Sequence, residues 1–337
     1  GQKRSIRDGV TAAPRSTDEV RAELVRLRAE TDAVSFVGGE PTLHPDLPDV
    51  VSTAQDLGFR TIGLQTNGRR LHRPGLLRML GDIGLTDLHL SIHGASPAAH
   101  HFHTGMAGSF ATAFGTLAAA RAAGLVVGVT TVLTRSNARG LGGLVQLLAS
   151  RGASAWCLAL PHARGRAATL FDRVMPRLGV AMPFALHALR VAEHHDLPAF
   201  VRGAPNCLLG PFARFALDDA PRAFSEGCGA CPARAGCSGL DAQYLERFDG
   251  DELSACEPVV RDVANEQLSS LFVGPGELAP LLDREIPSSP ARARVSLPML
   301  GKVQPARAEV PRSAGKRSGD ALRELFKELY TDEEPTE

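Results

Sequence analysis

Strand-like and helix-like patterns alternate along the first 200 residues, and this alternation constrains the fold more than any other feature. Apolar runs typical of strands begin at intervals of about 25 to 40 residues, with a helical pattern between them. The predicted strands are 33–37, 59–64, 86–92, 125–133 and 154–160, and the predicted helices between them are 46–57, 74–83, 109–123 and 140–151. Because parallel strands need a long crossover, usually a helix, this order predicts successive βαβ units in an α/β fold.

The remaining chain divides by composition. Residues 203–256 are rich in loop-forming residues and contain five of the six cysteines, and a helix is predicted at 259–272. Residues 284–318 are rich in Pro, Ser, Ala and Arg, and a short helix is predicted at 320–330. We therefore expect a barrel-like domain at 1–200, a cysteine-rich module at 203–256, a helical segment at 257–283, and a linker with a short helix at 284–337.

The charge balance argues against nucleic acid as an obligatory partner. Lysine plus arginine and aspartate plus glutamate each number 37, whereas phosphate binding usually needs a basic surplus. No apolar run approaches the roughly 18 residues of a membrane span, and the N-terminus lacks the apolar core of a signal peptide. These patterns predict a cytoplasmic protein with no membrane partner, whose cysteines bind metal rather than form disulfides.

The motif Gly38-Gly39-Glu40-Pro41, directly after the first of these strands, is the strongest functional signal. The strand itself is predicted to be buried. The two glycines allow a sharp turn that exposes backbone groups to a ligand, and Pro41 prevents the strand from continuing. Glu40 is therefore expected at the carboxyl edge of the sheet, where α/β folds bind ligands. A carboxylate among exposed backbone groups suits a small ligand with an ammonium group.

Polar residues also follow the later strands. Asn67 comes after the second strand, Ser91 and His93 come at the end of the third, and Thr131 lies in the fourth. Because the carboxyl ends of barrel strands meet at one edge, we expect these residues to approach the same ligand. Taken alone, Thr66-Asn67-Gly68 is equally typical of a simple turn.

Residues 34–167 as a whole resemble the radical S-adenosylmethionine (radical SAM) enzymes. Besides the Gly-Gly-Glu-Pro motif, the resemblance rests on residues 66–68, 90–94, 104–110 and 129–137. It implies a partial (β/α)6 TIM-like barrel in which S-adenosylmethionine is bound. The implied cofactor-binding residues are Gly38, Gly39 and Glu40 at the methionine amino group, Pro41 beside them, Ser91 near the ribose or carboxylate, His93 close to the site, and Asn67 and Thr131 as weaker candidates.

One element of that family has no counterpart in this sequence. Family members carry a CX3CX2C loop before the Gly-Gly-Glu-Pro motif, and its thiolates bind the reducing 4Fe–4S cluster. Here no cysteine precedes Cys157. Either the sequence begins just after that loop, with the first barrel strand also upstream, or the barrel has lost its cluster. Because the chain begins at Gly1 and not Met, and its first helix follows closely, truncation is the favoured expectation, and the chain alone is then expected to be inactive.

The module at 203–256 provides a second group of cysteines. Cys228, Cys231 and Cys237 have the spacing CX2CX5C, with Cys207 before them and Cys256 after them. Tight turns among glycine and proline can direct such thiols at one metal centre. The spacing resembles that of the SPASM and twitch extensions of radical SAM enzymes, which implies an auxiliary 4Fe–4S cluster. Cys207, Cys228, Cys231 and Cys237 are the expected ligands, and Cys256 is an alternative.

Two features leave the content of this module open. Asp241 stands where the CX2CX5CX3C pattern has its fourth cysteine, which favours one auxiliary cluster over two. Spacing alone equally allows a zinc site with four cysteines. Cys157 lies in an apolar run and is expected to be an inert core residue.

The histidines do not form a clear metal-binding pattern. His100, His101 and His103 lack a spaced carboxylate partner, and we expect them in a loop near the barrel mouth. His194 and His195 are expected at a solvated helix end.

The resemblance implies an enzyme that reductively cleaves S-adenosylmethionine to a 5′-deoxyadenosyl radical, which abstracts hydrogen from a substrate. The implied substrate is a peptide or a small molecule, with peptide or protein maturation favoured, and the implied reductant is a protein such as flavodoxin or ferredoxin. The alternative is a non-catalytic barrel that serves as a scaffold or binding protein, with a structural zinc or iron–sulfur site. Cysteines encoded upstream of Gly1 would favour the enzyme.

Overall fold

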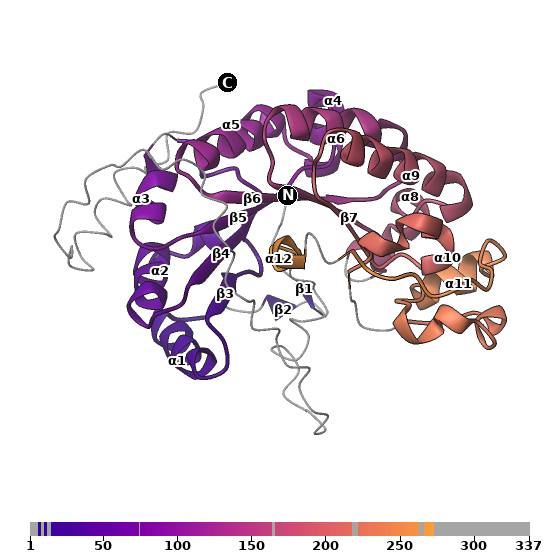
Figure 1. Ribbon diagram of the computed structural model, residues 1–337. Coiled ribbons are helices and arrows are strands. Elements are labelled where there is room, and N and C mark those ends of the chain that lie inside the picture. The colour runs from indigo at the N-terminus through magenta and orange to yellow at the C-terminus, as the bar shows by residue number, and fades with distance from the viewer. Residues whose placement is uncertain are drawn as a thin grey trace.

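A six-stranded parallel sheet forms the centre of the computed structural model, which describes residues 6–7, 10–11, 15–73, 75–163, 166–217, 222–262 and 266–272. Its strands lie side by side in sequence order and curve around a concave face, as Figure 1 shows. They are β3 (Ala33–Phe36), β4 (Thr61–Thr66), β5 (Asp87–Ser91), β6 (Val126–Val132), β7 (Ala155–Ala159) and β8 (Ala199–Arg202). The predicted α/β fold with a partial TIM-like barrel is confirmed.

Five strands overlap the five predicted ranges, and β8 is an addition that the sequence pattern did not indicate. With four residues, β8 is too short to show a clear period, but it pairs in parallel with β7 from Trp156↔Ala199 to Ala159↔Arg202. A separate two-stranded pair, β1 (Ile6–Arg7) and β2 (Val10–Thr11), is antiparallel.

Strand β3 corrects one prediction, because its four residues are half-buried rather than buried. It is the first strand in the sheet order and pairs with β4 alone among the described strands. Its other edge therefore lacks the strand cover that the inner strands have.

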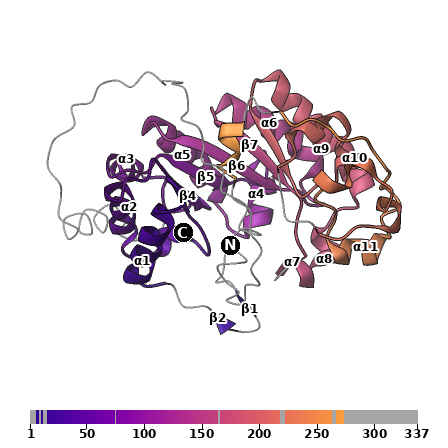
Figure 2. The ribbon, with the colours of Figure 1, turned by 60° about the horizontal axis from the view of Figure 1, so that its bottom comes forward.

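Helices cover the convex face of the sheet (Figures 1 and 2). They are α1 (Thr17–Arg28), α2 (Leu47–Asp56), α3 (Leu76–Asp82), α5 (Ser109–Ala122), α6 (Leu141–Ser150) and α9 (Leu178–His194). The shorter α4 (Pro97–Thr104) follows β5, and α7 (Arg166–Thr169) and α8 (Phe171–Val174) follow β7, at the carboxyl edge of the sheet. Helix α1 begins with a capping box, in which the Ser16 side chain accepts from the Glu19 amide and the Glu19 side chain accepts from the Ser16 amide. Within the described residues, no helix is long and apolar enough to cross a membrane.

The main hydrophobic core lies between the sheet and these helices, and a smaller cluster lies on the concave face. That second cluster consists of Ala155, Cys157, Phe200, Leu271 and Phe272. A Cβ on Gly128 would lie 3.2 Å from Phe272 Cε1, so the glycine leaves room for this packing. The expected burial of Cys157 is confirmed, since its exposed fraction is 1%.

The short helix α12 (Glu266–Ser269) precedes Leu271 and Phe272 and lies on the concave side of the sheet in Figure 1. This corrects the prediction of one helix over 259–272, because 259–262 has no helical structure. The interaction of Leu271 and Phe272 with the sheet, rather than a long amphipathic helix, accounts for the apolar residues there. The predicted linker at 284–318 and helix at 320–330 lie outside the described residues.

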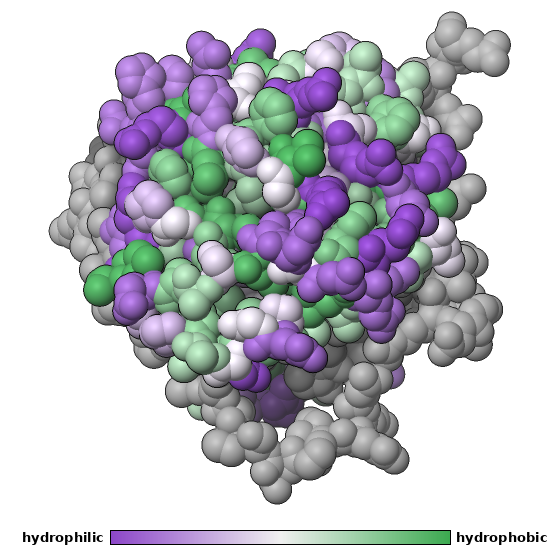
Figure 3. All heavy atoms as spheres, turned by 90° about the vertical axis from the view of Figure 1, so that its right-hand side faces the viewer, coloured by the Kyte–Doolittle hydropathy of each residue, from purple (hydrophilic) through white to green (hydrophobic). Residues whose placement is uncertain are grey.

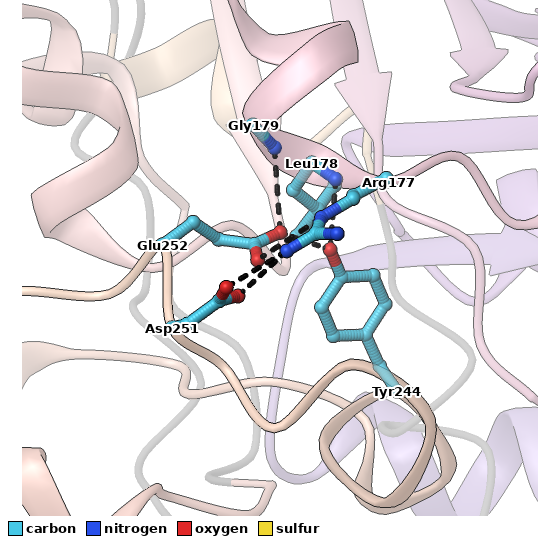
Figure 4. Close-up of polar contacts among 6 residues, drawn as sticks. All are labelled: Arg177, Leu178, Gly179, Tyr244, Asp251 and Glu252. Atoms are coloured by element: carbon cyan, nitrogen blue, oxygen red, sulfur yellow. Dashed lines mark hydrogen bonds and ion pairs between the residues drawn. The ribbon is translucent and has the colours of Figure 1, made fainter.

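The cysteine-rich module contains α10 (Asn206–Leu209), α11 (Ala242–Phe248) and three 3-10 turns, Gly210–Phe215, Glu226–Cys228 and Pro232–Gly236. A polar network drawn in Figure 4 fastens it to the barrel. The Tyr244 hydroxyl accepts a hydrogen bond from the Leu178 amide at 2.7 Å and donates one to Glu252. Glu252 also accepts from the Gly179 amide at 3.3 Å. The module thus satisfies free amides at the first turn of α9.

A solvated ion pair flanks this network. Arg177 lies 2.8 Å from Asp251 and 3.9 Å from Glu252. Burial, followed by the hydrogen bond to Glu252, raises the pKa of Tyr244 above its usual range, so its hydroxyl stays protonated. Seen from this side of the molecule, small hydrophobic areas alternate with hydrophilic residues (Figure 3), as expected of a solvated face.

Candidate functional site

The Gly-Gly-Glu-Pro loop leaves β3 at the carboxyl edge of the sheet, as predicted. Gly38 and Gly39 have φ values of +91° and +49°, which L side chains rarely adopt. No atom of the described residues lies within 4 Å of a Cβ built on either glycine, so this part of the structure leaves open space beside the backbone. The glycines therefore serve the conformation of the turn, and they leave its backbone groups within reach of a ligand.

The Glu40 carboxylate joins the loops that follow β3 and β4. Its Oε1 accepts hydrogen bonds from the Thr42 hydroxyl at 2.7 Å, the Thr42 amide at 3.3 Å and the Thr66 hydroxyl at 2.6 Å. Its Oε2 accepts one from the Asn67 amide at 2.9 Å. Oε2 thus has fewer partners than Oε1 and retains capacity for a further donor. Thr42 and Thr66 are site residues that sequence reasoning did not single out.

Asn67 contributes mainly to the turn after β4. Its side-chain oxygen accepts from the Arg69 amide at 2.9 Å, which is the local turn bond typical of asparagine. The structure therefore gives Asn67 the turn role that the sequence left open, while its backbone amide supports Glu40. Pro41 begins the 3-10 turn Pro41–Leu43, where its ring fixes the exit of the loop.

Ser91 and His93 lie at the end of β5, two strands from the Gly-Gly-Glu-Pro loop. Ser91 is half-buried and pairs with Thr130 in the sheet register, on the concave face. His93 Nδ1 accepts from the Val132 amide at 3.4 Å, which leaves the ring proton on Nε2. Burial first, and then the nearby His103 and His100, lower the pKa of His93 to about 3, so the ring is neutral.

The structure places Thr131 on the opposite face of β6 from the one expected. Its hydroxyl donates to Ile92 O at 2.7 Å and accepts from Trp156 Nε1 at 3.0 Å, and the residue is completely buried. Because side chains alternate along a strand, Thr130 and not Thr131 lies on the concave face. A ligand on that face cannot reach Thr131.

His100, His101 and His103 lie on α4 rather than in a loop, which corrects that expectation. His100 Nδ1 accepts from the His93 amide at 3.2 Å, and His103 Nε2 lies 3.1 Å from the Ser136 hydroxyl. These two histidines support the turn after β5. His194 ends α9 and His195 caps it, both exposed, which confirms the predicted helix end.

Five cysteines line one small pocket in the module. They are Cys207, Cys228, Cys231, Cys237 and Cys256, and all five are free thiols. Burial, the proximity of Cys231 and then that of Cys207 raise the pKa of Cys256 to about 11. Burial likewise raises the pKa of Cys207, with smaller effects that include nearby Cys237 and Cys228. These mutual effects show that the thiols are neighbours.

In the described part of the chain, no three His, Cys, Asp or Glu side chains converge closely enough to hold a single metal ion. The five thiols instead surround a pocket whose lining also includes Phe224 and Leu253. Closely grouped thiols in a partly apolar setting have the donor chemistry of a cysteine-ligated cluster. The residues present therefore fit such a group.

Asp241 has a structural role outside the cysteine pocket. Its carboxylate caps α11 by accepting from the Gln243 amide at 3.1 Å, and its other oxygen accepts from the Ala163 amide at 3.0 Å. Asp241 stands where the CX2CX5CX3C pattern has its fourth cysteine. In this structure it therefore connects the module to the loop after β7.

Residues 2–147 match the family model described as the Radical SAM superfamily. The match covers less than half of the chain. S-adenosylmethionine and a 4Fe–4S cluster are the cofactors that this family implies. The matched residues include the Gly-Gly-Glu-Pro loop, the turn after β4, and the ends of β5 and β6.

Two curated relatives are similar to part of the chain. The chain is 29% identical over 161 residues to the AdoMet-dependent heme synthase of Nitratidesulfovibrio vulgaris, covering 48% of this chain and 43% of the relative. It is 35% identical over 143 residues to the PqqA peptide cyclase of Xanthomonas campestris pv. campestris, covering 42% and 36%. The chain thus spans less than half the length of either relative.

Among solved structures, the chain is similar to Streptococcus suis SuiB bound to precursor peptide SuiA. The TM-score is 0.48 and the sequence identity 13%, over 58% of this chain and 44% of SuiB.

Proposed function

We propose that this protein is a radical SAM enzyme that binds S-adenosylmethionine at the carboxyl edge of the sheet. The observation that carries the proposal is the loop after β3, whose backbone at Gly38 and Gly39 faces open space while Glu40 is fixed beside it. The cofactor's ammonium would be held by carbonyl groups of this loop and by Glu40 Oε2. Ser91 and His93 would approach the rest of the cofactor from β5.

The hydrogen bonds of Glu40 support a role in preorganising this site. Four donors fix the carboxylate before any ligand arrives, so little side-chain entropy is lost on binding. Neutral His93 would offer its Nε2 proton without adding a positive charge beside the sulfonium of the cofactor.

The reducing cluster needs thiolates that this sequence does not contain before Cys157. We propose that they are encoded upstream of Gly1, as the CX3CX2C loop of the family. When bound, that cluster supplies the electron that cleaves S-adenosylmethionine, and the product radical abstracts hydrogen from the substrate. Translating the DNA upstream of Gly1 is the first test. A start codon close to Gly1 with no cysteine codons would refute the enzyme and favour the scaffold protein.

We further propose that the pocket formed by the five module cysteines holds one auxiliary 4Fe–4S cluster. Four thiolates ligate such a cluster, and Cys207, Cys228, Cys231 and Cys237 remain the favoured set with Cys256 as the alternative. A zinc ion with Zn–S bonds of about 2.3 Å would require closely converging sulfurs. Four such sulfurs would serve zinc as well, and the place of the pocket behind a barrel similar to that of radical SAM enzymes favours the cluster.

Anaerobic reconstitution of the chain, followed by iron and sulfide analysis, tests the auxiliary cluster. We expect about four irons and four sulfides per chain. Cys231→Ala should reduce both sharply, whereas Cys157→Ala removes a thiol from the sheet, outside the pocket, and should leave both unchanged. About one zinc without sulfide would refute the cluster, and eight irons would refute the count of one.

For the substrate, we propose a peptide or a small molecule, with peptide maturation favoured, and a flavodoxin or ferredoxin as the reductant. The similarity to a peptide cyclase supports a peptide, and the similarity to a heme synthase supports a small molecule. Release of 5′-deoxyadenosine by the reconstituted full-length protein with dithionite tests the chemistry independently of the substrate. Reduced, fully loaded protein that releases none would refute the proposed activity.

A further inference from the structure

Arg202 is a buried cation on the concave face of the sheet. Only 7% of the residue is exposed, and among the described residues it is the single lysine or arginine in the buried class. It ends β8, two residues after Phe200, whose side chain packs in the concave-face cluster with Cys157 and Phe272. Because side chains alternate along a strand, Arg202 lies on the same face as Phe200.

The Arg202 guanidinium has no anionic partner in the described structure. The ion pairs found there involve other arginines, each at least one-third exposed along the side chain. His89 on β5 feels the charge of Arg202: burial first, and then Arg202, lower the pKa of His89 to about 3. His89 is therefore neutral and cannot compensate the charge of Arg202. Its Nε2 lies 2.6 Å from the Thr130 hydroxyl.

A buried charge without a partner is costly, and proteins usually retain one only where it meets an opposite charge. Because Arg202 ends β8, a ligand at the carboxyl edge of the sheet is placed to supply that charge. The concave-face residues nearest the carboxyl edge, Ser91, Thr130, Val132 and Ala159, are half-buried and therefore still reach solvent. Arg202 pairs directly with Ala159 in the register, so it lies at this accessible edge.

We propose that Arg202 binds a carboxylate group of the substrate, an inference that rests on the proposed function. A guanidinium presents a planar fork of donors that matches the two oxygens of a carboxylate. The sheet order separates β8 from β3 by five strand intervals, or about 24 Å along the curved sheet. The carboxylate is therefore distinct from the methionine end of S-adenosylmethionine, which the Gly-Gly-Glu-Pro loop would hold.

Binding at Arg202 requires neither the iron–sulfur clusters nor S-adenosylmethionine. The chain alone is therefore sufficient for the test. The probes are propionate, its neutral isostere propionamide, and inorganic phosphate, at constant ionic strength. At ten times its dissociation constant, propionate should raise the thermal midpoint of the wild-type chain by about 3 °C, and propionamide should not. A larger response to phosphate than to propionate would overturn the carboxylate assignment.

Arg202→Met and Arg202→Lys complete the experiment. We expect Arg202→Met to abolish the response to propionate while leaving the ligand-free midpoint equal or higher, because an unpaired buried charge is removed. Arg202→Lys keeps the charge but loses the fork, so its propionate affinity should fall about tenfold. A lower midpoint in Arg202→Met with an unchanged propionate response would overturn the proposal and make Arg202 a structural residue. Absence of 5′-deoxyadenosine release would refute only the enzyme.

Discussion

Glu40 has two possible roles at the cofactor site, and two substitutions separate them. The carboxylate holds the loops after β3 and β4 together, and its charge is placed to attract an ammonium group. Glu40→Ala removes both contributions. Glu40→Gln removes the charge but keeps an acceptor for the Asn67 amide and a polar group toward Thr66, so the loops should retain their arrangement.

The magnitudes follow from the contacts. Loss of a hydrogen bond to a charged group costs about 1.5–3 kcal/mol, which corresponds to a roughly 10- to 150-fold weaker affinity for S-adenosylmethionine in both variants. Glu40→Ala also leaves four donors without their acceptor, among them the hydroxyls of buried Thr42 and Thr66. We therefore expect it to lower the free energy of unfolding by about 2–4 kcal/mol, and Glu40→Gln by about 1 kcal/mol.

Calorimetric titration of S-adenosylmethionine into the full-length protein measures the affinity, and urea denaturation measures the stability. Glu30→Gln, at an exposed end of α1, is the control and should change neither. If Glu40→Ala weakens binding and Glu40→Gln does not, the residue acts only by holding the loops. Wild-type affinity in both variants would remove Glu40 from the site.

Further measurements test the module and the buried histidine. Tyr244→Phe leaves the buried Leu178 amide and Glu252 without the hydroxyl, and it should cost about 2–4 kcal/mol in urea denaturation; a wild-type midpoint would show that the network does not fasten the module. His89 has a pKa near 3 when folded and about 6.5 when unfolded, so its contribution to stability is complete above pH 6.5 and is lost as pH falls toward 3. His89→Gln should therefore lose less stability between pH 7 and pH 5 than the wild type, and an equal loss would contradict the shifted pKa.

The sequence alone predicted the βαβ order, because a buried parallel strand and an amphipathic helix leave clear periods of hydrophobic residues. It also located the Gly-Gly-Glu-Pro turn, since glycine adopts the positive φ values of Gly38 and Gly39 without the steric cost of a side chain. The capping box at Ser16 and the grouping of cysteines are equally local patterns. Each of these features depends on residues that are close in the sequence.

Only the tertiary structure decided strand pairing, the face on which a side chain lies, and burial, because these depend on residues that are distant in the sequence. Strand β8 has four residues and exists because β7 offers it a hydrogen-bonding edge. Successive side chains of β6 point to opposite faces of the sheet, so Thr131 lies against Trp156 and Thr130 on the concave face. Which of the two faces the ligand side depends on how the strands pair across the whole sheet. Helix α4 begins at a Ser96 cap and brings His100 within hydrogen-bonding distance of the His93 amide, although the local sequence pattern indicates a loop. The isolated charge of Arg202 emerges only when distant strands meet, because burial is a property of the assembled fold.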